Sequence, residues 1–375
     1  MLVSVVSPDL SHNCLGRAYV LAQLIERNHE VEIVGPQLKG DIWEPIQDEY
    51  EYKGVKTGSR LYQFPFAVPD LLNQISGDVV YASKPRTTSY GLSLLATLGR
   101  DRPLILDIDD WETGFSYRHG KVKTYAKGIP HLLTVNSIYY KRSLEALSGL
   151  ADARTVSNQF LQDRFGGTMI PHAKDTDELD PTRYNKARSR DELDLPPDDF
   201  LVMFFGTPRP HKGVDDLAKA VAAIERDDVR AIVVGAHESQ YVDTVRELGG
   251  DSIIIRGMQP FDEIPKWLAA ADVIAIPQKD NPATWGQMPS KVYDAMAMGK
   301  PIIVTDVSDL SVALDGCGLI VDPGNVSQLR ESILRLHDDR ELRRSLGDSA
   351  RERCIEEYSY DAVAPVIDSV ISEVW

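Results

Sequence analysis

MPSKVYDAMAMGKPIIVTD, residues 288–306, has the pattern of a helix that leads into a buried strand. Lys291 and Asp294 are three positions apart, so on a helix their side chains share a face. A glycine and a proline then predict the helix end, and the apolar run Ile302–Val304 predicts the strand. Because helix starts bind anions and carboxylates accept hydrogen bonds from hydroxyl groups, this pattern indicates a ligand site. An ordinary amphipathic helix is the alternative.

Apolar runs on either side of this segment repeat the alternation of strands and helices along the chain. In the second half, strands are predicted at residues 201–205, 231–234, 252–255, 273–276, 302–304 and 319–321. In the first half, they are predicted at residues 2–6, 31–34, 78–81, 104–108, 153–156 and 168–170. Residues 36–66 are irregular and aromatic-rich, and are either a functional loop or an excursion at the sheet edge. The predicted fold class is α/β, with two facing doubly wound, Rossmann-like domains.

The chain of 375 residues is too long for a single typical core, so two domains are expected. Residues 174–199 are polar, contain three prolines and have no sustained apolar period. We predict a first domain over residues 1–175, a linker region over 176–198 and a second domain over 199–359. The helical residues 360–375 are expected to cross back and complete the first domain.

Composition argues against several classes of protein. With 43% hydrophobic and 26% charged residues the chain is typical of a globular protein, and no apolar run approaches the roughly 18 residues of a membrane span. The net charge of −16 argues against nucleic acid as a partner, because phosphate contacts need clustered basic residues. The three cysteines lack metal-ligand spacing. We expect a cytoplasmic protein, because the thiols read as reduced and no signal peptide is indicated.

FFGTPRPHKG, residues 204–213, is predicted as a strand end, a turn and a helix start that carry Arg209 and Lys212. Two cations beside a helix start can hold a diphosphate and stabilise the charge that develops as it leaves. A solvated basic loop is the alternative interpretation.

With these motifs, the second half of the chain resembles the donor-binding domain of GT-B fold glycosyltransferases, in particular the large retaining family 4. The matching pieces follow the order of that family: FFGTPRPHKG, LAAADV (268–273), PSKVYDAMAMGKPIIVTD, GCGLIVDPGN (316–325) and LRRSLGDSARER (342–353). About 150 residues are covered, and the first half of the chain is similar in architecture only. The resemblance implies a nucleotide-sugar donor, retention of anomeric configuration, and neither a metal nor a cofactor.

The resemblance also assigns roles to individual residues of the second half. Lys212, after Gly206 at the strand end, matches the phosphate-binding lysine of the family, and Lys291 matches a lysine near the phosphates. Asp294 takes the place of the glutamate that holds the donor ribose. Arg209 lies further along the chain than the arginine of the family, and it is expected to act as a second phosphate ligand from that displaced position.

The first carboxylate of the family's Glu-x7-Glu pair falls at Gly286, where this chain has no acid. Donor contacts there are expected from backbone N–H groups of Trp285, Gly286 and Gln287. A catalytically weak donor-binding subunit is one alternative function that this departure keeps open.

LILDIDDWE, residues 104–112, places Asp107, Asp109 and Asp110 at a strand end, with Asp109 where many family members have a histidine. A D-x-D pattern suits a divalent cation. A role for Asp109 and Asp110 in acceptor binding or acid/base catalysis is favoured over metal binding, and a surface role is the remaining alternative. His119 is a further acceptor-side candidate, although a lone histidine is more often structural.

Two other features of the first half concern the acceptor. The loop with Asn13 and Gly16 corresponds to a family loop that touches the acceptor and the donor phosphates. Residues 113–143 contain no acid, and their basic residues are Arg118, Lys121, Lys123, Lys127, Lys141 and Arg142. This basic segment is predicted to bind an anionic acceptor such as a lipid-linked phosphate, or to contact a membrane peripherally through residues 115–142. A solvated face with extended lysines is the equal alternative.

Together these patterns predict a glycosyltransferase that moves a hexose-type sugar from a nucleotide-diphosphate donor to a hydroxyl acceptor. The acceptor is expected to be a glycan, a lipid-linked molecule or a small molecule. A UDP-sugar epimerase on the same scaffold is the second alternative function, because it would use carboxylates for acid/base chemistry.

Overall fold

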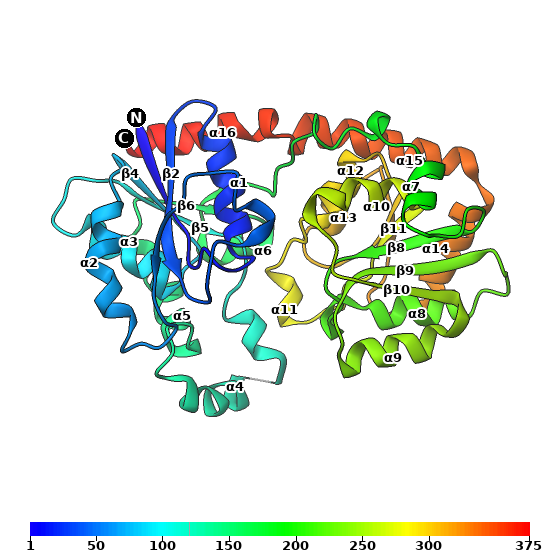
Figure 1. The fold of residues 1–375 in the computed structure, drawn as a ribbon, viewed down its shortest axis with the longest axis horizontal. Coiled ribbons are helices and arrows are strands. Elements are labelled where there is room, and N and C mark those ends of the chain that lie inside the picture. The colour runs from blue at the N-terminus through cyan, green and yellow to red at the C-terminus, as the bar shows by residue number, and fades with distance from the viewer. Residues whose placement is uncertain (120) are drawn as a thin grey trace. The chain divides into compact units, whose positions relative to one another are not determined.

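The computed structural model describes residues 1–119 and 121–375, without the side chains of residues 118–122 and 126. The chain forms two compact units of α/β type (Figure 1). The first unit comprises Met1–Ala173, Trp285–Met288 and Tyr360–Trp375, and the second comprises Lys174–Thr284 and Pro289–Ser359. Each has its own parallel sheet, which confirms the predicted fold class of two Rossmann-like domains.

The first unit has a seven-stranded sheet in the order β3-β2-β1-β4-β5-β6-β7, with every described pair parallel. Its strands are β1 Leu2–Val6, β2 Glu30–Gln37, β3 Lys53–Lys56, β4 Val79–Ser83, β5 Leu104–Ile108, β6 Ala153–Val156 and β7 Thr168–Met169. Its helices are α1 Leu15–Ile25, α2 Phe64–Gln74, α3 Leu92–Thr97, α4 Lys121–Gly128, α5 Ile138–Ala146, α6 Gln159–Phe165 and α16 Tyr360–Val374. The strand order reverses between β1 and β4, and such a switch point is where doubly wound sheets bind ligands.

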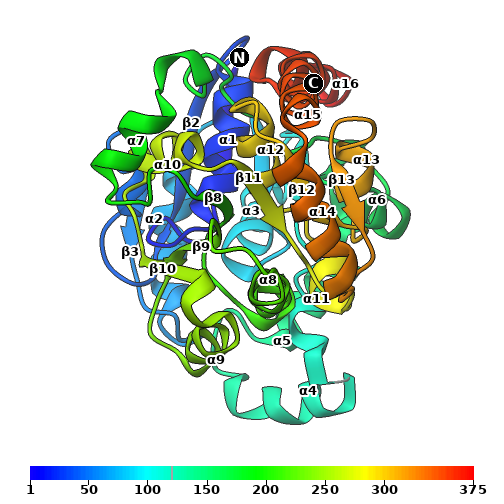
Figure 2. The same ribbon diagram turned by 90° about the vertical axis from the view of Figure 1, so that its right-hand side faces the viewer.

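Side chains of the first sheet alternate between two buried cores, one on each face. Val79 and Tyr81 of β4 belong to one core, while Val80 and Ala82 belong to the other. Helices α1 and α16 lie side by side over the first of these faces (Figures 1 and 2). The last helix of the chain is therefore part of the first unit's core.

Residues 36–66 contain a strand that the sequence pattern did not predict. β3 pairs in parallel with β2 at the edge of the first sheet. Its sequence, KGVK, is polar and only partly buried, and basic residues are typical of strands that must not pair with another chain. An edge strand of this kind lacks the apolar run on which the prediction relied.

The second unit has a six-stranded parallel sheet in the order β10-β9-β8-β11-β12-β13. Its strands are β8 Phe200–Phe205, β9 Val229–Ala236, β10 Ile253–Gly257, β11 Val273–Ile276, β12 Ile302–Thr305 and β13 Leu319–Val321. Its helices are α7 Lys186–Glu192, α8 Val214–Ala222, α9 Gln240–Gly249, α10 Ile264–Ala270, α12 Lys291–Ala297, α13 Leu310–Ala313, α14 Val326–Asp338 and α15 Arg340–Arg353. The short helix α11, Pro282–Trp285, ends at the first residue of the segment that belongs to the first unit. The strand order reverses between β8 and β11, so the loops after these strands mark the expected ligand side of this sheet.

Residues 176–198, predicted as a linker region, are packed into the second unit. Arg190 of α7 is fully buried, donates hydrogen bonds to backbone carbonyl groups that include that of Ala270, and pairs with Asp272 at 2.6 Å. A buried charge with this many partners holds α7 against α10. The polar composition of the stretch therefore reflects a buried ionic contact.

Among the described residues, no helix combines the length and the apolar character that a membrane span requires.

Candidate functional site

The loop after β8 and the start of α12 bring two lysines of the second unit together. Gly206 follows β8, has a φ of +120°, and donates its N–H to the Val234 carbonyl oxygen at 2.7 Å. A β-carbon at position 206 would lie 1.9 Å from Cε of Lys291. Only glycine therefore lets the Lys291 side chain lie over the strand end.

Lys212 ends a short turn, Pro210–Lys212, between β8 and α8. Its Nζ donates to the Thr207 carbonyl oxygen at 2.9 Å, so the side chain folds back over the loop. This loop is joined to the one after β11, because the N–H of Lys279 donates to the His211 carbonyl oxygen at 3.0 Å. Both loops at the switch point of the second sheet are thus held in place by backbone contacts.

Lys212 and Lys291 are both half-buried, and neither forms a salt bridge with a carboxylate among the residues that the structure describes. Burial, followed by the positive charges of Lys291 and Arg209, holds the pKa of Lys212 well below its usual value. Burial also lowers the pKa of Lys291, although Asp294 opposes the shift. Arg209 is exposed at the start of the turn. Adjacent cations that repel each other form a site for an anion.

Asp294 lies one helical turn after Lys291 and is bound by a residue that the sequence did not single out. Lys174 Nζ is 2.6 Å from Asp294 Oδ1, and both side chains are largely buried. Lys174 begins the second unit, and nothing in the local sequence pattern links it to α12. The charged groups of this site thus run from Lys174 and Asp294 to Lys291, Lys212 and Arg209.

Trp285, Gly286 and Gln287, which were expected to contribute donor contacts, belong to the first unit. The Gly286 carbonyl oxygen accepts a hydrogen bond from the Trp111 N–H at 2.9 Å, and Gln287 forms an antiparallel bridge with Asp110. A β-carbon at position 286 would lie 2.5 Å from Cβ of Trp111. A carboxylate side chain at position 286 would therefore clash with Trp111, which fills the space that it would need.

Trp285 remains 38% exposed and stacks on Trp111, with ring centroids 6.4 Å apart and ring planes 11° apart. Phe160 lies beside both indole rings, and the Arg164 guanidinium lies 4.7 Å from the centroid of the Trp111 ring. These aromatic contacts fix the short segment Trp285–Met288 on the first unit.

The acidic motif after β5 forms an ionic network around Lys84, which follows β4 and was not predicted. Lys84 Nζ donates to Asp109 Oδ1 and to Asp110 Oδ2, at 2.6 Å each. Its backbone has a left-handed φ of +67°, and its N–H donates to the Asp107 carbonyl oxygen at 2.9 Å. Strained non-glycine residues of this kind gather at functional sites.

Asp107 does not share this environment, because Arg17 binds both of its carboxylate oxygens at 2.8 and 2.9 Å. The three aspartates therefore do not converge on one point. In the described residues, no group of three or more His, Cys, Asp or Glu side chains has a metal-binding arrangement.

The two aspartates on Lys84 have opposite pKa shifts. Burial, together with the negative charges of Asp109 and Glu112, raises the pKa of Asp110 to about 6 against the attraction of Lys84. For Asp109, burial is outweighed by Lys84 and Arg17, and the pKa lies below its usual value. A partly accessible carboxyl that titrates near neutral pH can exchange a proton with a bound hydroxyl group.

The remaining acceptor-side candidates are placed less informatively. Asn13 is exposed, and its carbonyl oxygen accepts a hydrogen bond from the Gly16 N–H at 3.2 Å. Gly16 precedes the buried Arg17 of α1. Neither Asn13 nor Gly16 contacts the Lys84 network through a described hydrogen bond. The side chain of His119 lies outside the described residues.

The basic segment contains a polar hollow of about 330 Å³. Its lining residues are Ser116, Thr124, Lys127, Gly128, His131, Thr134, Asn136, Ser137 and Ile138, with no acid among them. Lys141 of the same segment instead points inward and pairs with Glu112 at 3.0 Å.

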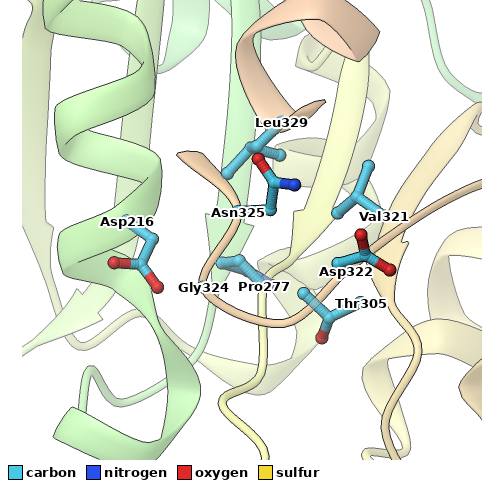
Figure 3. A pocket seen from close by; sticks show the side chains of 8 residues that line it. All are labelled: Asp216, Pro277, Thr305, Val321, Asp322, Gly324, Asn325 and Leu329. Carbon is cyan, nitrogen blue, oxygen red and sulfur yellow. The ribbon is translucent and has the colours of Figure 1, made fainter. Parts of the chain in front are cut away.

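A second hollow, in the second unit, has Asp216 of α8 across from Asn325 and Thr305 (Figure 3). It has no room for a water-sized sphere, so it is a packing defect and not a ligand pocket.

Comparison with known proteins relates the second unit to one family. Residues 199–339 match the model of the family described as glycosyl transferases group 1. This match contains Gly206, Lys212, Lys291 and Asp294. Residues 199–339 are therefore similar to glycosyl transferases of group 1, and the two units have the α/β architecture of the GT-B fold.

Among curated relatives, D-inositol 3-phosphate glycosyltransferase of Corynebacterium glutamicum is 31% identical over 199 residues, which are 50% of this chain and 46% of that protein. MMP alpha-(1->4)-mannosyltransferase of Mycolicibacterium hassiacum is 30% identical over 250 residues, 64% of this chain and 54% of that protein. The chain thus spans about half the length of these relatives.

Solved structures are similar over the whole chain. HepE from Anabaena in complex with UDP-glucose has a TM-score of 0.77 with 17% identity and covers 100% of both chains. Sucrose-phosphate synthase from Thermosynechococcus elongatus has a TM-score of 0.74 with 16% identity and covers 100% of this chain and 99% of its own. At these identities the similarity concerns the fold.

Proposed function

We propose that the protein is a glycosyltransferase that moves a hexose-type sugar from a nucleoside-diphosphate donor to a hydroxyl group of an acceptor. One observation carries the proposal. Lys212 and Lys291 form a half-buried pair of cations, neither of which has a salt bridge to a carboxylate among the described residues. The pair lies at the carboxyl end of β8, inside the part of the chain that matches the group 1 family.

The energetics of the two lysines favour a diphosphate as the ligand. Partly buried cations that repel each other destabilise a fold unless an anion compensates them. A diphosphate presents several oxygens to adjacent cations and forms charge-assisted hydrogen bonds with them. The exposed Arg209 is available to the same anion. UDP-glucose in the structurally similar HepE supports a nucleotide sugar as the donor.

Asp294 is proposed to accept hydrogen bonds from the ribose hydroxyl groups of the donor. Asp294 lies on the same helix as Lys291. A nucleotide has ribose hydroxyl groups next to its phosphates, and the site has a carboxylate next to cations in the same order. Donor contacts from the backbone N–H groups of Trp285–Gln287, a segment of the first unit, stay a prediction.

The same cations would promote the reaction. As the glycosidic bond to the phosphate breaks, negative charge grows on the diphosphate, and Lys212, Lys291 and Arg209 would stabilise it. This role makes a divalent metal unnecessary in the proposed mechanism. Retention of anomeric configuration belongs to the proposal through the family 4 resemblance.

In the first unit, Asp110 is proposed to bind the acceptor hydroxyl group and to take part in its deprotonation. Asp109 and Lys84 would hold the Asp110 carboxylate in place through the contacts described above. The acceptor class, a cytoplasmic location and a peripheral membrane contact through residues 115–142 stay predictions. The polar hollow within that segment, lined by Lys127 and His131 and by no acid, supports an anionic acceptor.

A direct test incubates the protein with UDP- and GDP-linked sugars, with and without a panel of glycan, lipid-linked and small-molecule acceptors. Release of nucleotide that depends on an acceptor and is lost in Lys212→Ala supports the proposal. The anomeric coupling of the product, measured by NMR, tests retention. Interconversion of the sugar without an acceptor would instead establish an epimerase, and binding without release would establish a donor-binding subunit.

A further inference from the structure

The Asp294 carboxylate has a partner within the protein itself. Lys174 Nζ lies 2.6 Å from Oδ1, and the two side chains are only 15% and 14% exposed. We infer that Lys174 is a positioning residue, which orients Asp294 toward the ribose hydroxyls of the donor and thereby sets a preference for ribonucleotides. This inference rests on the proposed function and adds a specificity determinant to it.

The backbone of Lys174 is fixed independently of its side chain. Its N–H donates to the Tyr358 carbonyl oxygen at 2.9 Å, and Lys174 forms a parallel bridge with Ser359. The Ser359 hydroxyl in turn donates to the Ile355 carbonyl oxygen at 2.7 Å. The Lys174 ammonium group therefore reaches Asp294 from a backbone position that hydrogen bonds hold in place.

The helix that carries Asp294 is fixed to the same segment. Tyr293, its neighbour on α12, packs against Tyr358 with ring centroids 4.7 Å apart. The buried Cys354 also contacts α12, with Sγ 3.7 Å from the Tyr293 carbonyl oxygen. Lys174 and the helix that carries Asp294 thus both pack against the segment from Cys354 to Ser359. The fold therefore sets the distance between the two charged groups.

The pair leaves Asp294 able to bind a ligand. Lys174 contacts Oδ1, and no hydrogen bond to Oδ2 is formed by the part of the chain that the structure describes. A carboxylate has about four acceptor positions, and one ammonium group occupies one of them. Oδ2 therefore remains for ribose hydroxyl groups, while the contact at Oδ1 holds the short aspartate side chain in one rotamer.

Two other roles for Lys174 would leave different signatures. A lysine that binds the donor phosphates would increase the affinity for ribonucleotides and for deoxyribonucleotides equally. A lysine that only fastens α12 to the chain would support stability without affecting the choice between them. The ratio of the two affinities therefore separates a positioning role from both alternatives.

The test measures dissociation constants by calorimetry for UDP and 2′-deoxy-UDP, and for GDP and 2′-deoxy-GDP. The variants are Lys174→Met, Lys174→Arg and Asp294→Asn, with Lys186→Met as a matched control, because Lys186 forms a lysine–aspartate pair with Asp272 elsewhere in the second unit. A hydroxyl group that donates to a carboxylate contributes about ten- to hundredfold in affinity, so the unmodified protein should prefer the ribonucleotide by about tenfold or more.

In Lys174→Met, most of that preference should disappear through weaker ribonucleotide binding, as in Asp294→Asn, while the 2′-deoxy affinity changes little. Lys174→Arg should retain part of the preference, and Lys186→Met should retain all of it. An unchanged preference in Lys174→Met, or an equal loss for both nucleotides of a pair, would overturn the inference alone. If the unmodified protein binds none of the diphosphates, the proposed function fails and the inference fails with it.

Discussion

Lys291 occupies the space where Gly206 would carry a side chain, with its Cε 1.9 Å from the position of that β-carbon. The position of the lysine side chain at the helix start thus depends on the glycine at the strand end. The glycine makes room, and the lysine brings its charge to the carboxyl edge of the second sheet. The proposed diphosphate site depends on this relationship.

Gly206→Ala tests this relationship directly. The new β-carbon would displace the Lys291 side chain, and the left-handed φ of +120° is strained for alanine by about 1–3 kcal/mol. We expect a lower free energy of unfolding in urea, and UDP or GDP affinity weakened by about tenfold by calorimetry. Gly257→Ala in the same unit is the matched control, because its β-carbon would have no neighbour nearer than 4.0 Å. Wild-type affinity in Gly206→Ala would contradict this role of the glycine.

Asp110 should impose a pH dependence on transfer. Its pKa is raised to about 6, so the carboxylate that accepts a proton from the acceptor is lost as the pH falls through that value. The rate at saturating donor should therefore decline below about pH 6, and Asp110→Asn should remove both the decline and most of the activity. Since Lys84 holds the pKa of Asp110 down, Lys84→Met should move the decline to higher pH. A wild-type pH profile in Asp110→Asn would exclude the proposed role.

Asp110 should also affect stability, with the sign set by its raised pKa. Between the usual value of 3.8 and about 6, the folded state binds more protons than the unfolded state. The contribution of Asp110 to folding stability is therefore fully present below pH 3.8 and is lost as the pH rises through about 6. Urea denaturation of the unmodified protein and of Asp110→Asn across this range measures the difference. An identical pH dependence in both would argue against the raised pKa.

Gly286→Ala should destabilise the first unit. The added carbon would lie 2.5 Å from Cβ of Trp111, and overpacking of this kind costs about 1–3 kcal/mol. Gly149→Ala is the control in the same unit, because its nearest neighbour would be 3.8 Å away. Urea denaturation is again the measurement. Equal stability of the two variants would show that Trp111 does not exclude a side chain at this position.

The sequence predicted most of the fold because buried strands have a clear signal. β5 and β11 lie at the predicted residues, since each is a short apolar run between polar segments. β3 was missed because an edge strand can be polar. Residues 176–198 were predicted as a linker region because their composition is polar. Composition does not show that a charged side chain such as that of Arg190 is buried and paired.

For the candidate site, local motifs carried the prediction and contacts between distant residues did not. The residues 206, 212 and 291 come together at one strand end and belong to two quoted motifs, 204–213 and 288–306, which are distant in sequence. The partners of the aspartates, Lys174 for Asp294 and Lys84 for Asp110, lie outside every motif that the sequence analysis quoted. Pairing with such residues depends on topology, which short sequence patterns do not encode.

Titration of UDP and GDP into the unmodified protein, Lys212→Ala and the control Lys186→Met is the most direct measurement of the central claim. The account predicts that Lys212→Ala weakens binding of the preferred diphosphate by about tenfold or more, because a charge-assisted contact to phosphate is lost. It also predicts that Lys186→Met binds like the unmodified protein. Since Lys212 is a half-buried cation without a carboxylate partner among the described residues, its removal should not lower the stability of the nucleotide-free protein. Unchanged diphosphate affinity in a folded Lys212→Ala variant would contradict the proposed donor site.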